Sequence, residues 1–306
     1  MIKIGTRASK LALYQAELVR SKLKTSFPLL EFQLVKIRTK GDMIRRGAIG
    51  SIGPGIFTRE IENALLAKEI DLAVHSAKDL ASELPQGLVL GAILEREDPR
   101  DCLVARQKQT LDQLRPGAKI GTSSLRRKAQ LKHLRHDLEI VDIRGNVDTR
   151  IKKVETGACD ALVVAHAGLK RLGLANAVTQ VFDAETLFPQ AGQGALAVEI
   201  REGDSETAEL TRLLNHPISF QTVGAERGFL RRLEGGCQVP AGIFSKVEGD
   251  ILTLKGAIFA LEGDQVVIES VSGAISGAEM LGTTLADQLL KSGGAEILKA
   301  IREGVK

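Results

Sequence analysis

The sequence predicts an α/β protein with a smaller α+β domain at its C-terminal end. Short apolar runs alternate with stretches of helical period over most of the chain, which is typical of strands and helices in mostly parallel sheets. After about residue 244 the pattern changes to short strands separated by Gly-Asp turns. This change predicts a separate domain with a three-stranded antiparallel sheet.

The α/β part consists of recurring units, in which an apolar run ends in a turn that contains Gly, Ser, Thr or His and a basic residue. The runs are 2–4, 70–74, 119–120, 140–143 and 161–165, and their turns are 5–9, 75–79, 121–127, 144–146 and 166–171. The first turn leads into an amphipathic helix over 10–24. Such turns share the carboxyl edge of a sheet, where ligands bind and where helix N-termini attract anions.

The C-terminal part is predicted to combine three short strands with two helices. The expected strands are 251–254, 257–261 and 265–271, and the expected helices are 278–291 and 295–302.

Composition excludes several classes of protein. Of the 306 residues 43% are hydrophobic and 26% charged, so we expect packed cores and no extensive disorder. Aromatic residues make up only 3%, which argues against stacking platforms for single-stranded nucleic acid. No signal segment is evident at the start, and no apolar run reaches the ~18 residues of a membrane helix. We therefore expect a cytoplasmic protein without a membrane or nucleic-acid partner.

Three cysteines, without metal-type spacing, do not indicate a disulfide framework. Cys102 and Cys159 adjoin apolar runs and are expected to be inert core thiols. Cys237 follows Gly235 and Gly236, which favour a tight turn that presents the thiol. The local sequence leaves open whether Cys237 is a reactive or attachment thiol or an inert one.

Basic residues gather in the predicted turns and early helix positions. They are Arg7, Lys78, Arg126, Arg127, Arg144, Arg150 and Arg171. A guanidinium binds a carboxylate or phosphate through two parallel hydrogen bonds. Surface ion pairs contribute only ~0–1 kcal/mol each and would not require this placement. We therefore expect a site for a strongly acidic ligand, against the alternative of solvated surface groups.

Asp79 is a carboxylate that directly follows Lys78. Among cations it would stay ionised, stabilise a developing cation and move a proton. The alternative is a helix-start aspartate that the helix dipole stabilises, and spacing leaves both open. His75 and His166 adjoin apolar strands and are expected to be structural rather than general bases. Phosphate-loop and dinucleotide motifs are absent from the sequence, so a nucleotide cofactor is not indicated.

Eight segments, taken together in order, resemble the porphobilinogen deaminase (hydroxymethylbilane synthase) family along nearly the whole chain. They are 6–12, 75–79, 96–101, 121–127, 144–147, 167–172, 192–195 and 233–240. The resemblance implies two lobes similar to type II periplasmic binding proteins and a third domain that carries a cofactor cysteine. The implied divisions are domain 1 at 1–94 and 195–213, domain 2 at 100–189, domain 3 at 217–306, and hinges near 95–99 and 190–194.

The resemblance also implies the chemistry. Cys237 would hold a dipyrromethane cofactor by a thioether, four porphobilinogens would be joined head to tail with loss of ammonia, and water would release hydroxymethylbilane for tetrapyrrole and haem synthesis. Asp79 matches the catalytic carboxylate. The matching cofactor-binding residues are Lys78, Ser124, Arg126, Arg127 and Arg144, and the matching substrate-binding residues are Arg7, Ser9, Arg144, Arg150 and Arg171. Each pyrrole brings two carboxylates, which explains the many arginines.

The glycine-rich segment 41–57 is either a mobile lid or a passive surface loop. The resemblance assigns the lid to Gly53, Pro54, Gly55 and Phe57. Pro54 stands where the family usually has a lysine, so the loop is expected to be stiffer and to carry one cation fewer.

We expect a monomer that hands its product to uroporphyrinogen-III synthase. Two rival hypotheses are a protein that clamps an anionic ligand without chemistry and a nucleic-acid binder with strong salt dependence.

Overall fold

The computed structural model describes residues 1–43, 55–233 and 239–304. Contacts within the chain group it into two compact units, Met1–Glu97 with Gly194–Val223 and Asp98–Gln193 with Gly224–Lys306. The second unit contains residues 100–189 and most of 217–306, so the expected three-domain division stays a prediction.

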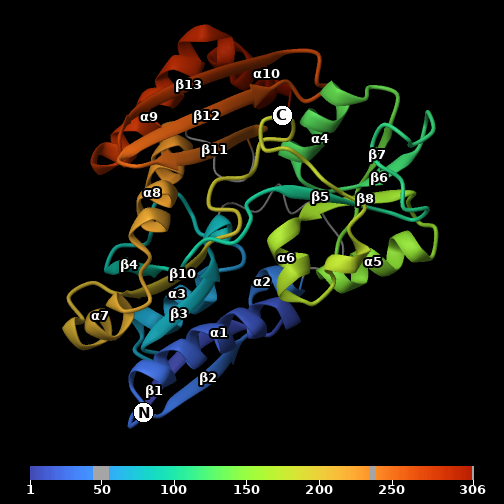
Figure 1. Cartoon of the computed structure of the whole chain (residues 1–306). Coiled ribbons are helices and arrows are strands. Elements are labelled where there is room, and N and C mark those ends of the chain that lie inside the picture. The colour runs from blue at the N-terminus through green and yellow to red at the C-terminus, as the bar shows by residue number, and fades with distance from the viewer. Residues whose placement is uncertain (44–54, 234–238, 305–306) are drawn as a thin grey trace. The chain divides into compact units, whose positions relative to one another are not determined.

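The first unit is built on a five-stranded sheet with the order β2-β1-β3-β10-β4 (Figure 1). Its strands are β1 (Ile2–Arg7), β2 (Phe32–Ile37), β3 (Leu72–Ser76), β4 (Leu88–Ile93) and β10 (Leu196–Arg201). Its helical segments are α1 (Lys10–Ser26), α2 (Lys40–Met43), α3 (Arg59–Leu66), α7 (Ser205–Arg212) and the 3₁₀ turn η2 (Ala77–Asp79). Strands β1, β2, β3 and β4 run in one direction, and β10 runs opposite to its neighbours β3 and β4. The mostly parallel sheet is therefore confirmed.

Helix α1 covers one face of this sheet because its apolar residues recur at helical spacing. Ala16, Val19 and Leu23 are fully buried and pack against Ile4 of β1 and Leu72 of β3. Ser9 caps the helix, since its side chain accepts a hydrogen bond from the Ala12 amide. The cap and the buried face fix the turn that follows β1.

The α/β part of the second unit repeats this arrangement, with the sheet order β7-β6-β8-β5-β9. Its strands are β5 (Asp101–Ala105), β6 (Lys119–Gly121), β7 (Glu139–Val141), β8 (Ala161–Ala165) and β9 (Gln180–Val181). Its helices are α4 (Leu125–Leu134), α5 (Val147–Glu155), α6 (His166–Arg171) and the 3₁₀ turn η3 (Ala175–Ala177). Strand β5 is antiparallel to both neighbours and takes the place that β10 has in the first sheet.

A three-stranded antiparallel sheet, β11-β12-β13, forms the C-terminal part of the second unit (Figure 1). Its strands are β11 (Ala241–Glu248), β12 (Ile251–Phe259) and β13 (Val266–Ala274). Its helical segments are the 3₁₀ turn η5 (Ile275–Gly277), α9 (Ala278–Leu289), the π turn η6 (Leu290–Gly294) and α10 (Ala295–Gly304). Helix α8 (Pro217–Arg232) begins in the first unit and ends in the second.

The predicted number of strands in this sheet is confirmed, but two predicted strands are wrong. Residues 251–254 and 257–261 belong largely to one strand, β12, and the first strand is β11. Gly256 is no turn residue: a Cβ there would lie 3.0 Å from a methyl of Leu285 in α9. Gly256 lets α9 pack closely against a strand that continues through this position. The composition of the sequence does not distinguish such a glycine from a turn glycine.

Among the residues that the structure describes, no helix combines the length and apolar character that a bilayer crossing requires.

Candidate active site

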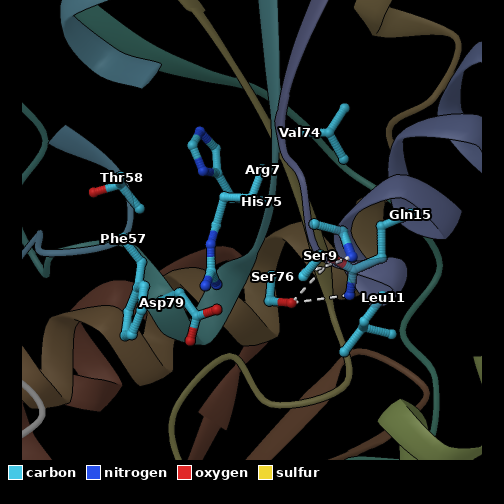
Figure 2. A pocket seen from close by; sticks show the side chains of 11 residues that line it. Arg7, Ser9, Leu11, Gln15, Phe57, Thr58, Val74, His75, Ser76 and Asp79 are labelled. Carbon is cyan, nitrogen blue, oxygen red and sulfur yellow. Dashed lines mark hydrogen bonds between the residues drawn. The ribbon is translucent and has the colours of Figure 1, made fainter. Parts of the chain in front are cut away.

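The first unit contains a pocket at the carboxyl ends of β1 and β3, beside the start of α3 (Figure 2). Polar and charged side chains contribute much of its lining. They include Arg7, Ser9, Thr58, His75, Ser76 and Asp79. Three residues expected from the sequence, Arg7, Ser9 and Asp79, therefore lie around one pocket.

Arg7 ends β1 and already has two neighbours. Its Nη2 lies 2.5 Å from Oδ1 of Asp42, and its guanidinium carbon lies 4.2 Å above the ring of Phe57. Burial raises the pKa of Asp42, but the hydrogen bonds and charge of Arg7, with Thr39, outweigh burial and hold that pKa below its usual value. Arg7 thus already binds the carboxylate of Asp42. A carboxylate of a ligand could take the place of Asp42.

Asp79 closes the 3₁₀ turn η2 directly after β3. Ala77 is buried, and its amide donates to the carbonyl of Ala195 at 3.0 Å, so the turn is tied to the start of the neighbouring strand β10. Lys78 and Asp79 are half-buried, and Asp79 lines the pocket. Ser76, one turn before, accepts from Nε2 of Gln15 on α1 at 2.9 Å (Figure 2). The carboxylate therefore stands on a turn that is held from both sides.

The adjacent arginines of α4 pair with one aspartate in the second unit. Oδ2 of Asp101 accepts from Nη2 of Arg126 at 2.7 Å, and Oδ1 accepts from Nη2 of Arg127 at 2.7 Å. Burial raises the pKa of Asp101, but the charges of both arginines outweigh burial and hold the pKa far below its usual value. Gln193 also donates to this carboxylate, at 2.9 Å. The cluster carries a net positive charge and is buried.

Ser124 caps α4 by accepting from the amide of Arg127. The hydroxyl thus takes part in the helix start that positions both arginines.

Arg144 and Arg150 lie together around Gly145, a residue with φ of 114°. Nε of Arg150 donates to the carbonyl of Gly145 at 2.7 Å, and Nζ of Lys153 donates to the carbonyl of Arg144 at 3.2 Å. Arg171 ends α6, which follows β8, and β8 is separated from β7 in the sheet by β6. The predicted substrate binders of this unit therefore follow β7 and β8, as expected.

Some predicted residues lie outside the described residues: Cys237, Gly53 and Pro54. Gly55, with φ of 82°, and Phe57 are described, and Phe57 lines the pocket. Cys102 and Cys159 are buried, and burial raises the pKa of both thiols, that of Cys102 to about 12. The prediction that both thiols lie in the core is confirmed, and a raised pKa makes a thiol less reactive.

Four acidic residues around these sites were missed by sequence reasoning: Asp42, Glu62, Asp101 and Glu199. Each is an ordinary acid in its local sequence, and only pairing across strands and helices brings it to a functional cation or histidine. Asp101 lies in segment 96–101, which resembles the family, but the sequence did not predict that it pairs with Arg126 and Arg127. Within the described ranges, no group of three or more His, Cys, Asp or Glu side chains is arranged to hold a metal ion.

Comparisons with known proteins identify one family over nearly the whole chain. The family model "Porphobilinogen deaminase, dipyromethane cofactor binding domain" matches residues 2–209, and "Porphobilinogen deaminase, C-terminal domain" matches 220–291. A porphobilinogen deaminase of Pelotomaculum thermopropionicum is 49% identical over 99% of this chain and 97% of its own length. One of Geotalea uraniireducens is 50% identical over 98% of this chain and 94% of its own length.

Solved structures similar to this chain include a probable extracellular amino-acid-binding protein, ytmK, of Bacillus subtilis. It has a TM-score of 0.41 at 12% identity and covers 72% of this chain and 93% of its own.

Proposed function

We propose, since the chain belongs to the porphobilinogen deaminase family, that it joins four porphobilinogens head to tail and releases hydroxymethylbilane. The observation that carries this proposal is the pocket in which Arg7 and Asp79 meet. Porphobilinogen has an acetate, a propionate and an aminomethyl group. The pocket offers a guanidinium for a carboxylate and a carboxylate for proton transfer at the amine.

Asp79 is the proposed acid and base. Its carboxylate pairs with the substrate's ammonium group, and the carbon–nitrogen bond breaks with its electron pair on nitrogen. Ammonia leaves, and the positive charge that stays on the substrate is stabilised by the carboxylate. Asp79 then takes up the proton that carbon–carbon bond formation releases and, in its acid form, passes it to ammonia or water, which restores the carboxylate. The held position of the η2 turn supports this role, because proton transfer requires a fixed donor.

The family implies a dipyrromethane cofactor, and the side chains of the second unit fit a group with several carboxylates. Arg126 and Arg127 carry two positive charges, and Asp101 compensates one of them. Nε of Arg126 is buried without a hydrogen-bond partner among the described residues. Ser124, Arg126, Arg127 and Arg144 would hold the cofactor's carboxylates. When bound through Cys237, the cofactor supplies the nucleophilic pyrrole carbon.

We further propose a cytoplasmic monomer that hands its product to uroporphyrinogen-III synthase. The absence of a coiled-coil pattern from the sequence supports a monomer.

Intact mass spectrometry tests the covalent cofactor. Protein purified from cells that make porphobilinogen is expected to weigh more than its sequence by about two pyrrole units, because a thioether survives a reducing cytosol. A mass equal to the bare chain would exclude the proposed attachment.

Asp79→Asn tests the catalytic role. The substitution keeps the shape and removes the titratable group, so product formation should fall at least about a hundredfold while the added mass remains. Product formed at a near-normal rate would remove Asp79 from the proposed mechanism.

A further inference from the structure

A group of acidic residues lies beneath the pocket, and the proposed mechanism does not use it. His75 lines the pocket, and its Nε2 lies 3.1 Å from Oε2 of Glu199. Glu62 interacts electrostatically with both. All three side chains are buried, with exposed fractions of 5%, 0% and 5% for His75, Glu199 and Glu62.

Strand pairing explains why these residues meet. In the antiparallel pair of β3 and β10, Ala73 is opposite Glu199 and His75 is opposite Ala197. Glu199 is therefore the diagonal neighbour of His75 on one face of the sheet, within reach of a long side chain. Ala73 opposite Glu199 leaves room for the carboxylate. Glu62 approaches the same place from α3, one turn after the pocket residue Thr58.

The two carboxyl groups lack full compensation. Within the described part of the chain, Oε1 of Glu62 and Oε1 of Glu199 are buried without a hydrogen-bond partner. The charged groups that face Glu62 are Glu199 of β10, His75 of β3 and Arg59 of α3 itself. Burial, and then the charge of Glu199, raise the pKa of Glu62. Uncompensated buried acids destabilise a fold, so their presence here requires a reason.

As long as Glu199 is ionised, these three buried groups carry no net positive charge, wherever the other protons lie. With both carboxyls ionised, the three groups carry a net charge of −1 if the imidazole is protonated and −2 if it is neutral. With Glu62 protonated, the net charge is 0 or −1. The three buried groups thus carry a negative or zero net charge in these states. Arg59, which also faces Glu62, is exposed, so water screens its positive charge.

We infer that Glu199 and Glu62, acting through His75, place negative charge beneath the pocket and favour the positively charged end of the substrate. This inference rests on the proposed function. The aminomethyl group is an ammonium in solution, and the substrate carries a positive charge again when ammonia leaves. Negative charge beneath the pocket stabilises both the ammonium form and this cation, while Arg7 binds a carboxylate of the substrate. Glu62, Glu199 and His75 are therefore positioning residues that select a pyrrole with an amine.

The test compares Glu199→Gln and Glu62→Gln with the wild type, using two pyrroles. One is porphobilinogen, and the other bears the same acetate and propionate but a methyl in place of the aminomethyl group. Each variant should lose about tenfold in kcat/KM for porphobilinogen, whereas the inhibition constant of the methyl analogue should change less than about twofold. Asp204→Asn, which keeps the N-cap of α7 but removes the charge that pairs with Arg201, is the control and should change neither value.

The pH profile provides a readout that a merely structural role would not move. Glu62→Gln removes a titrating group, so the acid limb of kcat/KM should become flatter than in the wild type.

Equal losses for both pyrroles, or no loss for either, would overturn the inference. If Glu199→Gln does not fold by circular dichroism, Glu62→Gln decides. A wild type that does not consume porphobilinogen would instead refute the proposed function itself.

Discussion

At the scale of single residues, the molecule is organised around buried charges that meet across long sequence separations. Asp101 lies 25 and 26 positions from Arg126 and Arg127, yet its carboxylate binds both guanidinium groups. A buried carboxylate between two arginines stabilises the fold only as a complete set, because removing one partner leaves an uncompensated charge. Arg126 and Arg127 therefore have a structural role in addition to the proposed binding of the cofactor.

Asp101→Asn should lower the free energy of unfolding by about 3–5 kcal/mol, since two buried arginines lose their shared counter-charge. Urea denaturation at neutral pH measures this loss. Glu209→Gln is a suitable control, because the ion pair of Glu209 with Arg212 is exposed on both sides and worth ~0–1 kcal/mol. Equal midpoints for the two variants would contradict a structural role for the Asp101 cluster.

The raised pKa of Glu62 predicts a pH dependence of stability. Between the usual value of 4.5 and its raised pKa, the folded state binds more protons than the unfolded state, so stability falls as pH rises through this window. Glu62→Gln should remove this fall, so the stability of the variant relative to the wild type should increase as pH rises. Urea midpoints from about pH 4 to about pH 8 measure the difference. The exposed Glu69→Gln should leave the pH dependence as it is, and parallel curves for Glu62→Gln and wild type would count against the prediction.

At the scale of elements, glycines set how closely the helices and strands of the C-terminal part approach. A Cβ on Gly282 of α9 would lie 1.9 Å from the carbonyl oxygen of Ala225 in α8. Such a contact is far too short, and its partner is backbone, so a side chain there requires the two helices to separate. The packing of α8 on α9 thus depends on the absence of one methyl group.

Gly282→Ala should destabilise the protein by about 1–3 kcal/mol, although alanine is the better helix former. Gly224→Ala in α8 is the matched control, because a Cβ there meets nothing within 4 Å. This control should stabilise the helix by up to ~1 kcal/mol. Thermal melts of both variants give the comparison, and a stabilising Gly282→Ala would show that the helices are not in tight contact.

The elements also show which predictions a sequence pattern supports. The helix expected at 10–24 is α1, and the strands expected at 70–74, 119–120 and 161–165 lie largely within β3, β6 and β8. Strands β3 and β8 are easily predicted because they are largely buried on both faces and therefore largely apolar. Strand β10 was not predicted, since its place is fixed by pairing with the distant strands β3 and β4 and not by a turn signal nearby. Strand β11 was missed although the turn at Gly249 and Asp250 joins it directly to β12.

At the scale of the whole molecule, the tethered cofactor is proposed to compensate the charge of the arginines assembled for it. Cys237→Ser should retain the mass of the bare chain and melt at a lower temperature than the loaded protein, because it lacks the carboxylates that bind only the folded state. Cys159→Ala is the control and should keep the added mass. A Cys237→Ser protein that carries the two extra pyrroles would place the attachment elsewhere.

The sequence by itself determined the fold class, the family and the residues of the pocket that carry charge, Arg7 and Asp79. These follow from local signals: apolar runs, the turns after them, and motifs in a fixed order. Only the tertiary structure decided which charges are paired. Glu199 reaches His75 across 124 positions, and Asp42 reaches Arg7 across 35. The energy of an ion pair depends on the distance between its two charges. Strand order and helix packing set that distance, and a local sequence pattern does not contain this information.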